Sequence, residues 1–77
     1  MSNNPRTFIV NIDPKVISKV FSIFYVHYNN KLDIELLPPK KKDKCLTILS
    51  NNIEDVTKAS NILKGIELGV IFGNIND

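Results

Sequence analysis

The last third of the chain constrains the fold most, because residues 52–72 carry a clear helical pattern. The first turn of this stretch holds residue types that favour a helix start: Asn52, Glu54 and Asp55. Apolar residues then recur at three- and four-residue spacing, which is typical of one buried helix face: Ile53, Val56, Ala59, Leu63 and Ile66. A helix with such a stripe needs an apolar surface to cover, and a sheet built from the rest of the chain can offer one.

Three glycines lie near the end of this predicted helix. Leu68-Gly69 predicts the helix stop, because glycine adopts the left-handed conformation that helix ends favour. Gly65 is interpreted as a place where the helix approaches the sheet closely. The short apolar run Val70-Ile71-Phe72 follows the stop, and Val70 to Ile75 is an optional last strand of the prediction.

The start of the chain predicts a lead, a strand and a helix. Residues 1–6 are interpreted as a flexible lead, and Thr7 to Ile12 as a strand with an alternating apolar face. Asp13-Pro14 predicts the start of a helix that runs to about Tyr28 and ends at Asn29-Asn30. Phe21 and Phe24 are predicted to pack in the core and Tyr25 to be exposed, although Tyr25 to Tyr28 would also suit a strand on propensity.

The middle of the chain predicts a hairpin. Leu32 to Leu36 alternates apolar and acidic residues, so Asp33 and Glu35 would lie on its wet face. Pro38-Pro39 ends this strand, and Cys45 to Ser50 forms the returning antiparallel strand. The predicted order is therefore β-α-β-β-α, with an optional final strand. We predict a single α+β domain over residues 7–77, a two-layer sandwich with one open sheet face.

Composition limits the function classes. The 77 residues carry a net charge of +2, with 43% hydrophobic and 23% charged residues, which is typical of a globular protein. No apolar run approaches the ~20 residues of a membrane span, and the N-terminus lacks the apolar core of a signal peptide. The lone Cys45 fits a reducing compartment. We therefore expect no membrane partner and a location in the nucleus, nucleolus or cytoplasm.

No pattern in the chain predicts catalysis, a cofactor, a metal site or a small-molecule substrate. His27 has no Ser or Cys partner at a suggestive spacing, and Cys45 on a strand is interpreted as a small buried hydrophobe. Asp33 and Glu35 are interpreted as the solvent-facing residues of an alternating strand. We expect that the protein is not an enzyme.

The strongest electrostatic feature is a lysine run at the predicted hairpin tip. Lys40, Lys41, Lys42 and Lys44 could contact phosphates and release counterions, with help from Arg6 and Lys31. A solvated loop without a partner is the alternative interpretation of the same residues.

The segment from Thr57 to Val70 resembles the last helix of the first KH-like domain in small-subunit ribosome-assembly factors, above all the partner-of-NOB-one family. Two patterns are shared. Thr57 to Lys64 has the order threonine-lysine-alanine, a small residue, a polar residue, two apolar residues and lysine. Leu68 to Val70 then has the order leucine, glycine and an apolar residue. The other predicted elements fit the family in order, and the KRR-type assembly factors share this layout.

The resemblance implies a degenerate KH-like domain that works in pre-ribosomal particles during ribosome biogenesis and rRNA processing. Its partners would be ribosomal RNA and other assembly or ribosomal proteins. Family members have two KH domains whereas this chain ends after one, and the Gly-x-x-Gly clamp of ordinary KH domains is missing. No RNA ligand of the family carries over to a residue of this chain.

Three hypotheses follow. The first is a non-catalytic RNA- or ribosome-binding module that uses the basic loop. The second is a protein-interaction module without direct RNA contact, which docks through the sheet edge or an apolar patch at Val70-Ile71-Phe72. The third is a ferredoxin-like regulatory domain, which requires residues from Val70 to Ile75 to pair inside the sheet.

Overall fold

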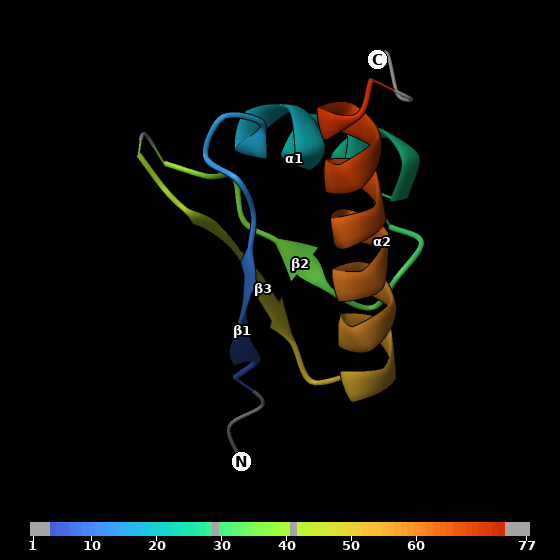
Figure 1. The fold of residues 1–77 in the computed structure, drawn as a ribbon. Helices are drawn as coiled ribbons and strands as arrows, with labels where there is room; N and C mark the ends of the chain where they lie inside the picture. The colour runs from blue at the N-terminus through green and yellow to red at the C-terminus, as the bar shows by residue number, and fades with distance from the viewer. Residues whose placement is uncertain (1–3, 29, 41, 74–77) are drawn as a thin grey trace.

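The computed structural model describes residues 4–28, 30–40 and 42–73 of the chain. Its elements in chain order are β1 (Arg6–Asn11), α1 (Ile17–Tyr28), β2 (Glu35–Leu36), β3 (Cys45–Ser50) and α2 (Ile53–Ile71). Figure 1 shows a small sheet with the two helices packed beside it. This arrangement confirms the predicted α+β class, with three antiparallel strands and two helices.

The strands lie in the order β1-β3-β2, and β3 pairs antiparallel with both neighbours. Residues of β1 and β3 pair from Arg6 opposite Ser50 to Asn11 opposite Cys45, and Glu35 of β2 lies opposite Leu49. Side chains alternate across the sheet. One face turns its apolar residues toward the helices, and the other face is left uncovered.

One hydrophobic core lies between the sheet and the helices. Val20 of α1, Leu46 and Ile48 of β3, and Ala59 and Leu63 of α2 are almost completely buried. Four residues of the stripe predicted for α2 are in this core, namely Val56, Ala59, Leu63 and Ile66. Burial of these side chains is the main stabilising contribution, at about 25 cal/mol for each Å² of apolar surface removed from water.

The prediction for the end of α2 is wrong. The helix continues through Gly69 to Ile71, and beyond it the N–H of Phe72 donates to the carbonyl of Leu68 and the N–H of Gly73 to that of Val70. Val70 packs against the core, so burial there holds the helix together past a glycine. The left-handed glycine that follows the helix is Gly73, with φ +76°.

This correction removes most of the predicted last strand. Residues 70–71 are helical and residues 72–73 form a turn, whereas Asn74 and Ile75 lie outside the described residues. The ferredoxin-like hypothesis therefore loses the described part of the strand that it requires, residues 70–73. The interpretation of Gly65 is also wrong, because Gly65 is exposed and a Cβ built on it meets no atom within 4 Å.

Helix α1 begins later than predicted and ends as predicted. The chain first makes a turn at residues 14–16, where Asp13 Oδ1 accepts the N–H of Lys15 and the Asp13 carbonyl accepts the N–H of Val16. Asp13 therefore caps this turn, and α1 starts at Ile17. The segment up to Tyr28 is helical, and Asn30 after it has the left-handed φ of +67° that was expected of a helix stop. Asn29 lies outside the described residues.

Strand β2 is two residues long, although five were predicted, because the backbone of Asp33 is bonded elsewhere. Its N–H donates to Asp55 Oδ2 at 2.7 Å, and its carbonyl accepts the hydroxyl of Ser50 at 2.6 Å. Asp33 therefore joins the start of α2 to the sheet, and of the two acidic residues predicted for this strand only Glu35 belongs to β2. Strand β1 begins one residue earlier than predicted, so Arg6 is part of the sheet.

Candidate nucleic-acid interface

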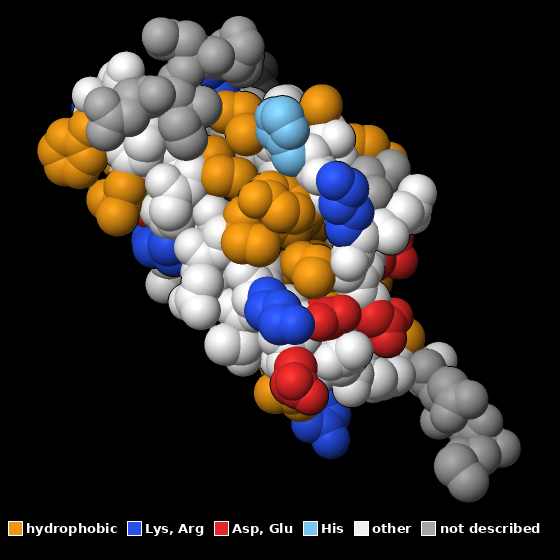
Figure 2. Space-filling model, turned by 90° about the vertical axis from the view of Figure 1, so that its right-hand side faces the viewer, with side chains coloured by type: hydrophobic (Ala, Val, Ile, Leu, Met, Phe, Trp, Pro, Cys, Tyr) orange, Lys and Arg blue, Asp and Glu red, His pale blue; other side chains and the backbone are white. Residues whose placement is uncertain are grey.

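The surface on the α2 side of the molecule has mixed charge. Figure 2 shows apolar side chains gathered in the middle of this face, with basic and acidic side chains next to one another below them. Figure 2 therefore gives no uniformly basic surface on this side. Among the described residues, no helix is long and apolar enough to cross a membrane.

The predicted lysine loop lies at one end of the sheet. Lys40, Lys42 and Lys44 are exposed, and Lys41 lies outside the described residues. The carbonyl of Lys44 accepts the N–H of Ile12 at 3.2 Å, so this loop lies beside the end of β1. Asp43 Oδ2 accepts the N–H of Lys40 at 2.7 Å, which holds the turn with an acidic group among the lysines.

The other two predicted residues lie away from this loop. Arg6 pairs with Ser50, at the far end of β3 from Cys45, which is roughly 17 Å away at ~3.4 Å per residue. Lys31 follows α1, and Asp33 just after it is bonded to Ser50. The structure therefore does not bring the six predicted residues together in one site.

Two lysines that were not predicted lie at the same end as the loop. Lys15 is exposed in the turn after β1, and Lys64 Nζ donates to the carbonyl of Asn11 at 2.9 Å. A sequence signal exists for Lys15 alone. Antiparallel pairing of residues 7–12 with residues 45–50 places the turn after the first strand beside the lysine run.

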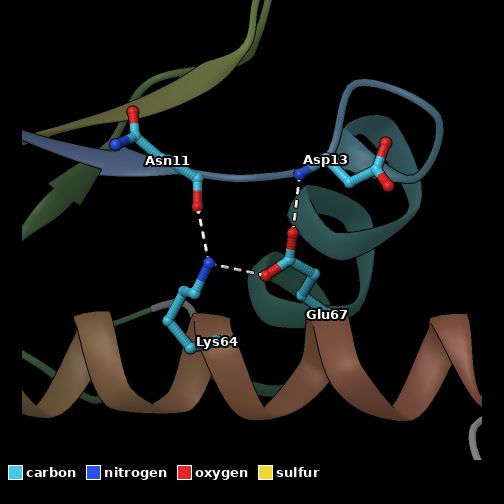
Figure 3. A network of polar contacts seen from close by, with 4 residues as sticks. All are labelled: Asn11, Asp13, Lys64 and Glu67. Carbon is cyan, nitrogen blue, oxygen red and sulfur yellow. Dashed lines mark hydrogen bonds and ion pairs between the residues drawn. The ribbon is translucent and has the colours of Figure 1, made fainter.

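Lys64 is part of a network between α2 and the end of β1 (Figure 3). It forms an ion pair with Glu67 Oε1 at 2.7 Å, and Glu67 Oε2 accepts the N–H of Asp13 at 2.6 Å. Burial by itself raises the pKa of the Glu67 carboxyl, but the hydrogen bonds from Lys64 and Asp13 and the charge of Lys64 lower that pKa below its ordinary value. These groups hold the fold together at the end of the sheet next to the lysine loop.

A second feature is a cleft of about 530 Å³ between α1 and β2. The residues that line it are mostly aromatic or apolar: Phe21, Phe24, Tyr25, Tyr28, Asn30, Ile34, Glu35, Leu36 and Pro38. This volume lies within the ~300–1,000 Å³ that is common for ligand sites.

The aromatic rings of the cleft form two stacks at helical i, i+4 spacing. Phe21 and Tyr25 have ring centroids 5.6 Å apart, and Phe24 and Tyr28 have centroids 5.2 Å apart. Phe24 is buried in the core and Tyr25 is 48% exposed, as predicted, whereas Phe21 is half-buried. The Phe21–Tyr25 stack is therefore the more exposed of the two.

The residues that line the cleft include few polar groups. Glu35 on β2 supplies the one carboxylate among the lining residues, and Asn30 supplies an amide. Two lysines lie close to lining residues in the sequence. Lys31 follows Asn30 directly, and Lys40 lies two residues after Pro38. No Ser, Cys or His lines the cleft, and the described residues contain no His, Cys, Asp and Glu group that could hold a metal ion.

The cleft was missed because the helical spacing of the aromatic residues favoured core packing for Phe21 and Phe24. The available signal was that α1 carries four aromatic residues, more than the two residues of β2 can cover. That signal depends on the length of β2, which is set by the distant hydrogen bonds of Asp33 to Asp55 and Ser50.

The comparisons give no relatives on which to base a function. No family model matches the chain, and no curated protein or solved structure shows a significant match.

Proposed function

We propose that this chain is a non-catalytic RNA-binding module of the degenerate KH-like type, which holds single-stranded RNA in the aromatic cleft between α1 and β2. The observation that carries the proposal is the stacked Phe21–Tyr25 pair in a cleft whose lining residues Asn30 and Pro38 are closely followed along the chain by Lys31 and Lys40. Aromatic side chains next to basic ones are the usual means of binding single strands.

The cleft suits bases rather than phosphates. Each base that stacks on an aromatic side chain contributes about 1–3 kcal/mol, and every base has a face that can stack. The carboxylate of Glu35 repels a phosphate from the cleft and can accept a hydrogen bond from a base amino group. The bases would therefore lie inside and the backbone outside.

The lysines would then follow the RNA backbone. Lys31 and Lys40 lie within two residues of the lining residues Asn30 and Pro38, and Lys42 and Lys44 continue the basic loop toward the turn that holds Lys15. Each phosphate contact on a single strand contributes about −0.7 to the slope of log affinity against log salt. Arg6 lies at the other end of β1 and takes no part in this path.

The resemblance of residues 57–70 to small-subunit assembly factors supports ribosomal RNA as the target, in a pre-ribosomal particle of the nucleus, nucleolus or cytoplasm. The segment lies within the single continuous helix α2, and Lys58 on it is exposed. In this proposal α2 shapes the domain, and α1 with β2 provides the RNA contacts.

Fluorescence anisotropy with a labelled single-stranded RNA of ten nucleotides tests the proposal. Tyr25→Ala should weaken binding by about 5- to 150-fold, which is the loss of one stacked base. The matched control is Val26→Ala, which removes a neighbouring side chain that is 76% exposed and does not line the cleft. Equal affinities of the two variants, or a wild-type protein that binds no RNA, would contradict the proposal.

A second candidate is a protein-docking module that uses the end of α2. Ile71 and Phe72 are 46% and 73% exposed, so two neighbouring large apolar side chains face solvent at the end of this helix. Co-purification from a cell extract, with RNA and protein both identified, separates the two functions. A protein partner that is lost in Phe72→Ser, with RNA absent from the wild-type complex, would favour docking.

A further inference from the structure

The feature that carries a further inference is the outer edge of β1. In an antiparallel sheet, the N–H and C=O groups of one residue point to the same side of the strand, and those of the next residue point to the opposite side. The N–H of Ile12 donates to Lys44, which continues β3, so even-numbered residues of β1 point toward β3. The odd-numbered residues Thr7, Ile9 and Asn11 therefore point away from it. The carbonyl of Asn11 agrees, because it accepts from Lys64 of α2.

Helix α2 closes this edge at one end only. In its first turn, Asp55 accepts a hydrogen bond from the N–H of Asp33, which lies on the β2 side of the sheet. Its later turns reach the outer edge of β1, where Lys64 satisfies the carbonyl of Asn11 and Glu67 satisfies the N–H of Asp13 (Figure 3). The helix thus crosses the sheet diagonally. Thr7 and Ile9 lie at the other end of β1, where both are exposed, Ile9 to 57%.

We propose that two copies of this chain associate by antiparallel pairing of their β1 edges, with Phe8 of one copy opposite Phe8 of the other. Thr7 of each copy then faces Ile9 of the second copy. Each of these two pairs exchanges two backbone hydrogen bonds, which gives four in all. The two three-stranded sheets become one sheet around a two-fold axis, as a symmetric dimer requires.

The backbone groups favour this register over its neighbours. Pro5 has no N–H, and in the proposed register it lies opposite Asn11 of the second copy, whose carbonyl is already satisfied by Lys64. A shift that centres the ladder on Thr7 would place the carbonyl of Ile9 against Pro5. A shift that centres it on Ile9 would place the N–H of Thr7 against the occupied carbonyl of Asn11.

The charges fit the same register. The stretch from Thr7 to Ile9 carries no charged side chain, and Arg6 lies opposite Val10 of the second copy rather than opposite its own symmetry mate. Proline and charged residues are also common means of blocking edge strands. Here Pro5 and Arg6 lie outside the paired stretch, so they limit the ladder to one register and do not block it.

The interface is small, which sets its expected strength. Three residues from each copy form the ladder, and such a contact falls well below the ~1,200 Å² of a stable interface. We therefore expect a weak, reversible dimer that forms at protein concentrations of about 1 mM and dissociates at micromolar concentrations.

A matched pair of variants tests this dimer. Ile9→Pro removes an N–H that faces the outer edge, where proline is tolerated, and Ile9→Thr loses the same apolar side chain but keeps the N–H. Sedimentation equilibrium up to about 1 mM should show self-association of the wild type and of Ile9→Thr, and at least a tenfold weaker association of Ile9→Pro. Hydrogen exchange of the Thr7 and Ile9 amides should slow as the concentration rises.

A monomeric wild type at about 1 mM would overturn the proposal. So would a dimer of equal strength in Ile9→Pro and Ile9→Thr, since the contact would then lie elsewhere on the surface. If Ile9→Pro does not fold, Thr7→Pro and Thr7→Val provide the same comparison at the other position of the ladder.

Discussion

The side chain of Lys64 on α2 donates to the backbone carbonyl of Asn11 at 2.9 Å, and so joins the middle of a helix to the last residue of a strand that lies 53 positions earlier. The same ammonium group pairs with Glu67, which holds the N–H of Asp13. This link satisfies two backbone groups at the point where the sheet leads into α1.

Lys64→Met should lower the free energy of unfolding by about 1–3 kcal/mol, because it leaves the nearly buried Glu67 carboxylate without its cationic partner. Urea denaturation followed by circular dichroism measures the change. Lys58→Met on the exposed face of the same helix is the control and should change stability by less than about 0.5 kcal/mol. Equal effects of the two variants would show that the link contributes nothing.

The stability of the fold should depend on the protonation of Glu67. Its pKa is lowered in the folded state from an ordinary value of 4.5, because Lys64 and the Asp13 N–H favour the carboxylate. A carboxyl group whose pKa is lower in the folded than in the unfolded state stabilises the fold at every pH above its unfolded-state pKa. This stabilisation is lost as the pH falls through the folded-state pKa. The difference in unfolding free energy between wild type and Glu67→Gln should therefore be constant above about pH 6 and shrink below about pH 4.5. A difference that does not change with pH would contradict this assignment.

Gly65→Ala and Gly73→Ala should have opposite effects. Gly65 lies inside α2 with open space around it, so alanine should stabilise the helix by about 0.5–1 kcal/mol. Gly73 has a φ of +76°, where a Cβ is strained, so alanine there should destabilise by about 1 kcal/mol. Thermal unfolding of both variants is the measurement, and the same sign for both would contradict the helix end described here.

Glu35→Gln should raise the affinity for single-stranded RNA by a few-fold at low salt, because it removes a negative charge from the cleft. The gain should shrink as salt screens the charge. Glu54→Gln, on the exposed first turn of α2, is the matched control for net charge. If both variants gain equally, the effect comes from total charge and not from the cleft.

The α+β class and most of the core could be predicted from sequence, because apolar spacing is a local signal. The buried face of α2 was predicted from the apolar stripe between Val56 and Ile66. The buried face of β3 was predicted from the alternation of Leu46 and Ile48. The end of α2 could not be predicted in this way, since burial of Val70 overrides the glycine before it.

The candidate site was harder to predict because it depends on contacts between distant residues. The lysine run was recognised as a cluster, but the separation of Arg6 from it follows from the register of β1 against β3. The cleft lies next to the short strand β2, and just before β2 the backbone of Asp33 bonds to Ser50 and Asp55. Neither fact is visible in the order of residues around the site.

The most direct test of RNA binding in the cleft is a titration of the ¹⁵N-labelled protein with a ten-nucleotide single-stranded RNA, followed by NMR. We predict that the amides of Tyr25, Glu35 and Lys40 shift together, while those of Ser60 and Asn61 on α2 do not move. Shifts that spread over the lysine loop alone, or that appear on α2 without the cleft residues, would contradict the proposed binding site.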